Sequence, residues 1–141
     1  MSDLTCFEQA VMKKLLRGED EVLSILREQL NVVEVSNREL TGAGFYTTLS
    51  VLPEAQSILG NPSFKLGDVI ARIQGLKLGA GFLLYVQEGV LHMLEGYTYD
   101  EPWPQFISLY ELSYTNVDER DMDSLRKILS GRLSGSEQVN E

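Results

Sequence analysis

The feature that most constrains the fold is a change of hydrophobic period near residue 32. Before it, apolar residues recur every three or four positions, the spacing of one helical face. After it, in "VVEVSNREL" (32–40), apolar and polar residues alternate, the period of a half-buried strand. Helices followed by a run of strands joined by short breaks predict the α+β class.

Two helices are predicted over roughly the first 30 residues. Thr5 and Glu8 have the spacing of a capping box, and Gly18 falls where a glycine commonly ends a helix. Asp20 can cap the second helix. Since about three residues join the two helices, we expect an antiparallel pair. The first apolar stripe contains Leu4, Phe7, Val11, Leu15 and Leu16, and the second contains Val22, Leu23, Leu26 and Leu30.

About six strands are predicted in the middle of the chain. The segment "FLLYVQ" (82–87) is almost wholly apolar, so we expect a central strand with both faces covered. "EG" at 88–89 predicts a tight hairpin to the next strand. Residues 52–66 are predicted to form a long loop with one helical turn at 54–58. The other strand segments are 32–40, 45–51, 67–76, 90–97 and 106–114, and the last of these has Phe106, Tyr110, Leu112 and Tyr114 in alternation.

The C-terminal segment predicts a third helix. Asn116 or Asp118 can cap it, and Gly131 can end it. The predicted architecture is a largely antiparallel sheet of about six strands with two N-terminal helices and one C-terminal helix. We expect a single domain over residues 1–133 and a disordered tail over 134–141. The stripe of the third helix is Met122, Leu125, Ile128 and Leu129.

Charge and composition limit the kinds of partner. The 141 residues include 21 acids and 12 bases, a net charge of −9, which disfavours nucleic acid and anionic membranes. No apolar run approaches the roughly 18 residues of a membrane span, and the N-terminus lacks the pattern of a secretory signal. The single cysteine, Cys6, rules out an internal disulfide. We therefore expect a cytoplasmic protein.

The sequence lacks the residue patterns of a phosphate-binding loop, a histidine metal site and a cysteine nucleophile. "GAGF" at 42–45 and 79–82 leads into strands rather than helices, which favours close backbone approach over a phosphate loop. His92 is the single histidine, lies in a strand and has no companion ligands, so we interpret it as structural or surface. Cys6 is interpreted as a small, partly buried helix residue rather than a nucleophile. No cofactor or metal is predicted.

The stretch "LEGYTYDEPWP" (94–104) is the candidate site. Its carboxylates and rings combine flat apolar surface with acceptor oxygens, which suits a sugar, a cationic ligand or a basic protein patch. Prolines at 102 and 104 stiffen the loop. Glu95, Tyr97 and Tyr99 are expected to share one strand face. The candidate binding residues are Glu95, Tyr97, Tyr99, Asp100, Glu101 and Trp103.

Three interpretations of this stretch remain open at the level of sequence. The favoured function is a non-catalytic module that binds a basic protein through an acidic aromatic loop, in a neutralising or adaptor role. The alternative is a binder of a sugar-like or cationic small molecule, or a hydrolase with paired carboxylates, whose pocket lies between the sheet and 52–66. In the third interpretation Trp103 and one tyrosine fill the end of the core while the acids face water. The oligomeric state is left open, and a homodimer is compatible with the sequence.

Three segments carry a resemblance to other proteins. "GAGFYTT" (42–48), "GLKLGAGFLL" (75–84) and "LEGYTYDEPWP" (94–104) resemble small uncharacterised bacterial proteins of about this length, over most of the chain. The resemblance implies a compact bacterial cytosolic protein. It implies no activity and no catalytic residue.

Overall fold

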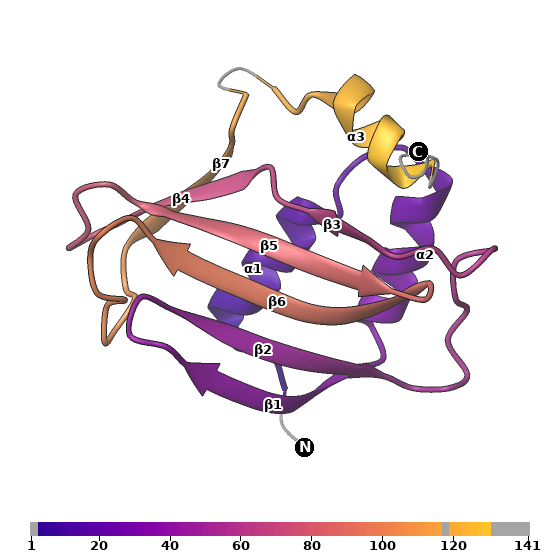
Figure 1. Cartoon of the computed structure of the whole chain (residues 1–141), viewed down its shortest axis with the longest axis horizontal. Coiled ribbons are helices and arrows are strands. Elements are labelled where there is room, and N and C mark those ends of the chain that lie inside the picture. Colours follow the sequence, from indigo (N-terminus) through magenta and orange to yellow (C-terminus); the bar gives the residue numbers. More distant parts are fainter. Residues whose placement is uncertain (1–2, 117–118, 131–141) are drawn as a thin grey trace.

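The structure, a computed structural model, describes residues 3–116 and 119–130. Within them, three helices and seven strands form an α+β fold with two N-terminal helices and one C-terminal helix (Figure 1), which confirms the predicted class. The helices are α1 (Cys6–Leu15), α2 (Glu21–Leu30) and α3 (Met122–Leu129). The strands are β1 (Val33–Leu40), β2 (Gly44–Val51), β3 (Phe64–Leu66), β4 (Val69–Ile73), β5 (Ala80–Gln87), β6 (Val90–Thr98) and β7 (Tyr110–Tyr114).

The strands form one antiparallel sheet in the order β1-β2-β6-β5-β4-β7, and β3 pairs with β5 beside this path. The three-residue β3 was not predicted, because Pro62 and Gly67 flank a run too short to show a period. The expected helical turn at 54–58 is wrong: the chain only turns near residues 53–55. The strand β7 is shorter than predicted, and Phe106 lies before it, 81% exposed.

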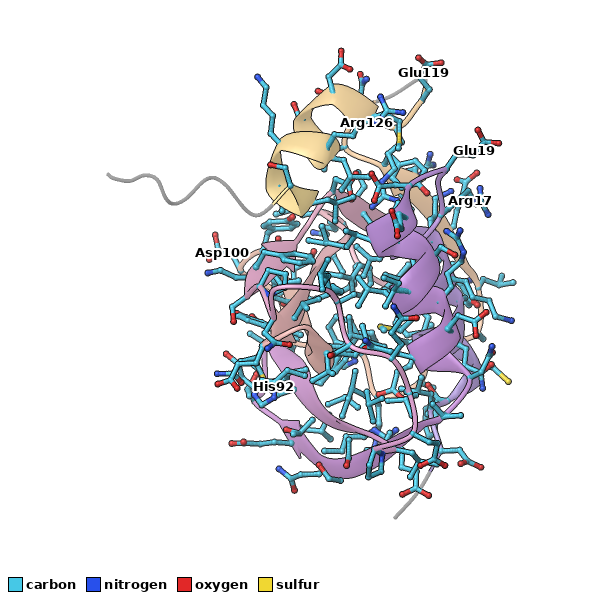
Figure 2. All side chains as sticks on the ribbon, turned by 90° about the vertical axis from the view of Figure 1, so that its right-hand side faces the viewer. Arg17, Glu19, His92, Asp100, Glu119 and Arg126 are labelled. Atoms are coloured by element: carbon cyan, nitrogen blue, oxygen red, sulfur yellow. The ribbon has the colours of Figure 1, made fainter. Side chains whose placement is uncertain are left out.

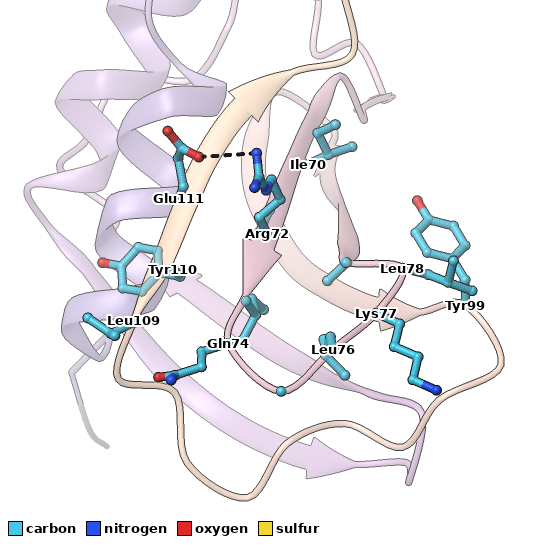
Figure 3. A pocket seen from close by; sticks show the side chains of 15 residues that line it. Ile70, Arg72, Gln74, Leu76, Lys77, Leu78, Tyr99, Leu109, Tyr110 and Glu111 are labelled. Carbon is cyan, nitrogen blue, oxygen red and sulfur yellow. Dashed lines mark ion pairs between the residues drawn. The ribbon is translucent and has the colours of Figure 1, made fainter.

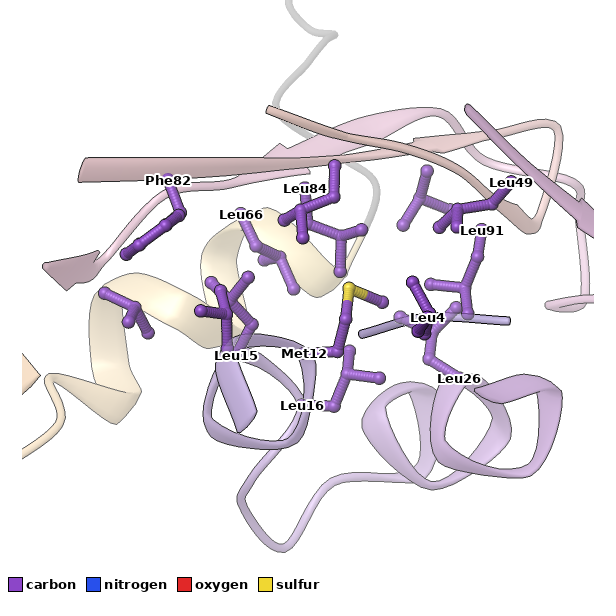
Figure 4. Close-up of a cluster of buried hydrophobic side chains, with 14 of the residues drawn as sticks. Leu4, Met12, Leu15, Leu16, Leu26, Leu49, Leu66, Phe82, Leu84 and Leu91 are labelled. Atoms are coloured by element: carbon purple, nitrogen blue, oxygen red, sulfur yellow. The ribbon is translucent and has the colours of Figure 1, made fainter. Parts of the chain in front are cut away.

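The central position of β5 is confirmed, but none of the described helices lies on its outer face. The three helices lie on the inner side of the sheet, where the buried apolar side chains meet (Figure 4). On the outer side Leu83 and Tyr85 remain half-buried. The prediction that both faces of this strand are covered therefore holds for the inner face, while the outer face is only partly covered within the described residues. The largest fully buried side chains include Met12, Leu15, Leu16, Leu26, Leu66, Phe82, Leu84 and Leu91.

Local hydrogen bonds start the helices. Thr5 and Glu8 form the predicted capping box, with Glu8 N donating to Thr5 Oγ1 at 3.0 Å and Thr5 N donating to Glu8 Oε1 at 2.8 Å. Asp20 Oδ1 accepts from Val22 N at 2.8 Å, also as predicted. None of the described helices combines the length and the apolar character that crossing a membrane requires.

The start of α3 differs from the prediction. Its cap is Asp121, whose Oδ1 accepts from Ser124 N at 3.1 Å, rather than Asn116. The other expected cap, Asp118, lies outside the described residues, as do Gly131 and the tail 134–141. An aspartate directly before the helix can reach its free N–H groups, which a residue several positions earlier cannot.

The β5–β6 hairpin confirms the tight turn. Glu88 has φ 50° and Gly89 has φ 82°, so both central residues have the positive φ of a type I′ turn. The register of the pair shifts between Tyr85 and Val86, since Val86 faces Leu91 but Tyr85 faces Met93, and beyond the shift Leu83 faces Glu95 and Leu84 faces Leu94. From buried Leu94 onward the side chains alternate, so Glu95 points to the outer face.

Candidate functional site

The structure divides the predicted site residues between the two faces of the sheet. On β6, Leu94 and Gly96 are buried toward the helices, and Glu95 and Tyr97 are half-buried on the outer face between them. Asp100 lies on the side away from the helices, as does His92 (Figure 2). The shared face of Glu95 and Tyr97 therefore follows from strand alternation, and Tyr99 joins it through its contact with Tyr97. Glu101 and Trp103 depart from this face.

Glu95 lies in the middle of the outer face. Its Oε1 accepts a 2.8 Å hydrogen bond from Tyr85 Oη, and Tyr46 is directly opposite on β2. The charge of Glu95 is the main cause that raises the pKa of Tyr46. In the part of the chain that the structure describes, no lysine or arginine lies within ion-pair distance of Glu95.

Two tyrosines extend this surface. The rings of Tyr97 and Tyr99 meet edge to face, with centroids 5.6 Å apart and planes at 85°. Burial, followed by the neighbouring Tyr99, raises the pKa of Tyr97. Tyr99 is 41% exposed and continues the aromatic surface to the end of the sheet. We call Tyr46, Tyr85, Glu95, Tyr97 and Tyr99 the outer patch.

Each "GAGF" segment has a glycine that permits close approach, as predicted: Gly44 in the first and Gly81 in the second. A Cβ atom at Gly81 would lie 2.5 Å from Tyr97 Oη, so the missing side chain makes room for that ring. A Cβ atom at Gly44 would lie 1.9 Å from the carbonyl oxygen of Gly96 on the neighbouring strand. These glycines shape the sheet and the outer patch.

Glu101 serves the fold. Its two carboxylate oxygens accept hydrogen bonds from Lys77 N at 3.0 Å and Leu78 N at 2.8 Å. These backbone bonds lower the pKa of Glu101. A carboxyl group held ionised in this way is poorly suited to act as a general acid, which needs a raised pKa.

Trp103 lies on the inner side, at the end of the core. Its ring centroid is 5.1 Å from that of Phe45 and 6.4 Å from that of Phe7, and its backbone N donates to Gly42 O at 2.7 Å. The ring is half-buried against the hydrophobic core. Trp103 therefore occupies the position expected of a residue that fills the core end, away from Glu95.

A surface cavity of about 900 Å³ surrounds the β4–β5 turn (Figure 3). Tyr99 and Leu78 border it on one side, and the ion pair of Arg72 with Glu111 (3.8 Å) crosses β4 and β7. Tyr99 lines this cavity and Tyr85 lines another of about 410 Å³, whereas neither cavity includes Glu95 or Asp100. Glu95 thus lies on the outer patch beside these cavities rather than inside them.

The remaining reactive side chains lie apart. His92 is exposed on β6, and Cys6 is exposed at the start of α1, which corrects the expectation that it is partly buried. Across residues 3–116 and 119–130, no three His, Cys, Asp or Glu side chains gather as a metal site would require.

Sequence reasoning missed Tyr46 and Tyr85. The alternation in 45–51 places Tyr46 opposite the apolar face, but the strand order that brings it beside Glu95 is not a local property. No family model, curated protein or solved structure matches the chain, and its resemblance to small bacterial proteins stays a prediction.

Proposed function

We propose that this protein is a non-catalytic binding module and that the outer patch receives a lysine or arginine side chain of a basic partner. The single observation that supports the proposal is the position of Glu95. It is a half-buried carboxylate, bonded to Tyr85 at 2.8 Å and surrounded by tyrosine rings, with no basic side chain beside it in the described chain.

The chemistry of this arrangement favours a cation. A carboxylate held by a neutral phenol keeps its negative charge available to a ligand. Tyrosine faces attract ammonium and guanidinium groups, and the attraction grows when the site is shielded from water. Tyr97 lies near enough to Glu95 to feel its charge, and the Tyr97 ring is in contact with Tyr99.

The shape of the outer patch favours a macromolecular partner. Small-molecule sites are usually concave and enclose most of the ligand, whereas Glu95 lines neither the cavity beside Tyr99 nor the one beside Tyr85. A side chain presented by another protein needs only an open surface with anchoring rings. The net charge of −9 would speed the approach of a basic partner, in keeping with a neutralising or adaptor role.

Binding of a fluorescein-labelled oligolysine peptide, followed by anisotropy, tests this function. Glu95→Gln is expected to weaken binding about tenfold, the scale of one lost ion pair in a partly desolvated site. Glu88→Gln is the matched control, because it removes the same charge from the exposed β5–β6 turn. We expect the control to have a small effect that disappears as salt is added.

Two results would contradict the proposal. If both variants weaken binding equally, the peptide responds to net charge alone. If the wild-type protein binds oligolysine no better than a neutral peptide of equal length, the outer patch is not a cation site.

A further inference from the structure

A second surface is the outer edge of β7, which among the described strands pairs with β4 alone. Two hydrogen bonds to the chain of β4 show which backbone groups of β7 point toward that strand. Gln74 N donates to Leu109 O at 3.0 Å, and Thr115 N donates to Asp68 O at 2.9 Å. In an antiparallel ladder the intervening residues direct their backbone groups the other way. The N–H and C=O groups that point away from β4 are those of Tyr110, Leu112 and Tyr114. No backbone hydrogen bond within the described chain uses them.

The opposite edge of the sheet is protected, whereas β7 is not. β1 has a register shift between Val35 and Asn37 and carries charged side chains such as Arg38, features that discourage another strand from pairing. β7 pairs with β4 in continuous register and contains neither proline nor lysine. Its single charged side chain, Glu111, faces Arg72 on the outer side. The backbone edge of β7 is thus open to an added strand.

A groove of about 580 Å³ runs beside this edge. One wall is β7 itself, and the other is the end of α1 with the turn that follows it. Asn116, Glu119 and Arg120 line one end. The lining residues are Lys14, Arg17, Gly18, Leu112, Ser113, Tyr114, Asn116, Glu119, Arg120 and Met122.

The groove has an excess of positive charge in an otherwise acidic protein. Lys14 Nζ lies 4.5 Å from the centroid of the Tyr114 ring, and the pKa of Lys14 is lowered by burial and by the charges of Arg17 and Arg120. No described carboxylate is within ion-pair distance of Lys14 or Arg17. Glu119 is the single acid of the described lining.

Arg120 is already engaged by the fold. Its Nε and Nη2 donate to the two oxygens of Asp68 at 2.8 and 3.0 Å, and Nη2 also donates to Leu15 O at 2.6 Å. It therefore fixes the groove wall, while Lys14 and Arg17 remain to meet a ligand.

We propose that an extended peptide segment with acidic side chains binds along β7 as an additional strand, with its carboxylates beside Lys14 and Arg17. The outward backbone groups supply the hydrogen bonds of strand addition. Leu109, 64% exposed, and Tyr110 offer an apolar contact at the other end of β7. This acidic partner is distinct from the basic one proposed for the outer patch.

The probe is a blocked, fluorescein-labelled peptide of alternating valine and threonine that ends in two glutamates. We expect it to bind and to shift the amide resonances of Leu112 and Tyr114. Two companion peptides separate the contributions: one ends in lysines, and one is N-methylated at alternate amides. Each is expected to bind at least about tenfold more weakly, because one loses the charge match and the other the backbone bonds.

Charge-matched protein variants complete the test. Lys14→Gln with Arg17→Gln should weaken binding about tenfold, whereas Lys13→Gln with Lys77→Gln, which removes two exposed charges elsewhere, should leave it unchanged. Circular dichroism verifies that each variant is folded. Equal binding of all three peptides, equal effects of the two double variants, or unmoved resonances of Leu112 and Tyr114 would overturn the proposal. So would the absence of binding to the folded wild-type protein.

Discussion

Tyr85 donates a 2.8 Å hydrogen bond to Glu95 across the β5–β6 pair, on the side of the sheet without helices. The two residues are diagonal neighbours, since Leu83 is the direct partner of Glu95 and Met93 that of Tyr85. The bond to Glu95, together with burial and the charge of Glu95, raises the pKa of Tyr85 to about 12. The phenol thus stays protonated and holds the carboxylate in place.

Replacement of Glu95 should change this titration. We expect Glu95→Gln to lower the pKa of Tyr85 from about 12 toward its ordinary value of 10, because the acceptor bond and the charge are lost. Tyrosinate absorbance during an alkaline titration measures this pKa. The component of the titration that is missing in Tyr85→Phe belongs to Tyr85. A pKa raised on folding stabilises the protein below pH 10, and this contribution is lost as the pH rises through about 12. An unchanged titration in Glu95→Gln would contradict the assignment.

The buried carboxylate of Glu8 predicts acid sensitivity. Burial alone raises its pKa, but hydrogen bonds from Arg38, Thr47 and the Thr5 backbone outweigh burial and hold the pKa below 4.5. Arg38 Nη2 donates at 2.6 Å and Thr47 Oγ1 at 2.6 Å. A lowered pKa stabilises the fold above pH 4.5, and this stability is lost as the pH falls through the folded-state value.

Glu8→Gln should therefore reduce the free energy of unfolding by about 2–4 kcal/mol at neutral pH, since it leaves Arg38 without its partner. It should also flatten the dependence of stability on pH below 4.5. Urea denaturation at a series of pH values measures both. Glu28→Gln, at an exposed position of α2, is the control and should change stability by less than about 0.5 kcal/mol. Similar pH profiles for wild type and Glu8→Gln would disprove the effect.

Trp103 is expected to contribute to stability rather than to binding. Trp103→Ala removes a half-buried ring from Phe45 and Phe7 and should cost about 2–4 kcal/mol, somewhat less than for a fully buried tryptophan. Phe106→Ala, at an exposed ring nearby, should cost less than about 0.5 kcal/mol. Chemical denaturation followed by circular dichroism compares them. If Trp103→Ala stays folded but binds oligolysine more weakly than the wild type, Trp103 takes part in binding and the prediction is wrong.

Local signals explain why much of the fold could be predicted. The capping box of Thr5 and Glu8 and the turn at Glu88 and Gly89 depend on residues within three positions of each other. The period change separates helices from strands for the same reason. The strand β3 was not predicted, because its three residues are too few to show an alternation and because it forms by pairing with β5.

The site was predictable only along one strand. Alternation alone puts Glu95 and Tyr97 on one face. The strand order β2-β6-β5 adds Tyr46 and Tyr85, and no local pattern contains that order. Beyond β6 the chain turns at Asp100, whose φ is 61°, and carries Trp103 around to the inner side. The six residues predicted within 95–103 are therefore divided between the two sides of the sheet by one backbone turn.

Glu101 offers the last prediction, because its carboxylate joins two turns. Glu101→Gln should accelerate amide hydrogen exchange at Lys77 and Leu78, since a neutral amide group replaces two charge-assisted acceptors. The wild-type pKa is lowered by these bonds, so the protection should be full above pH 4.5 and weaken as the pH falls below it. Exchange measured by NMR tests this, with Asp100→Asn as the neighbouring control. Equal exchange at both amides in wild type and Glu101→Gln would show that other contacts hold the β4–β5 turn.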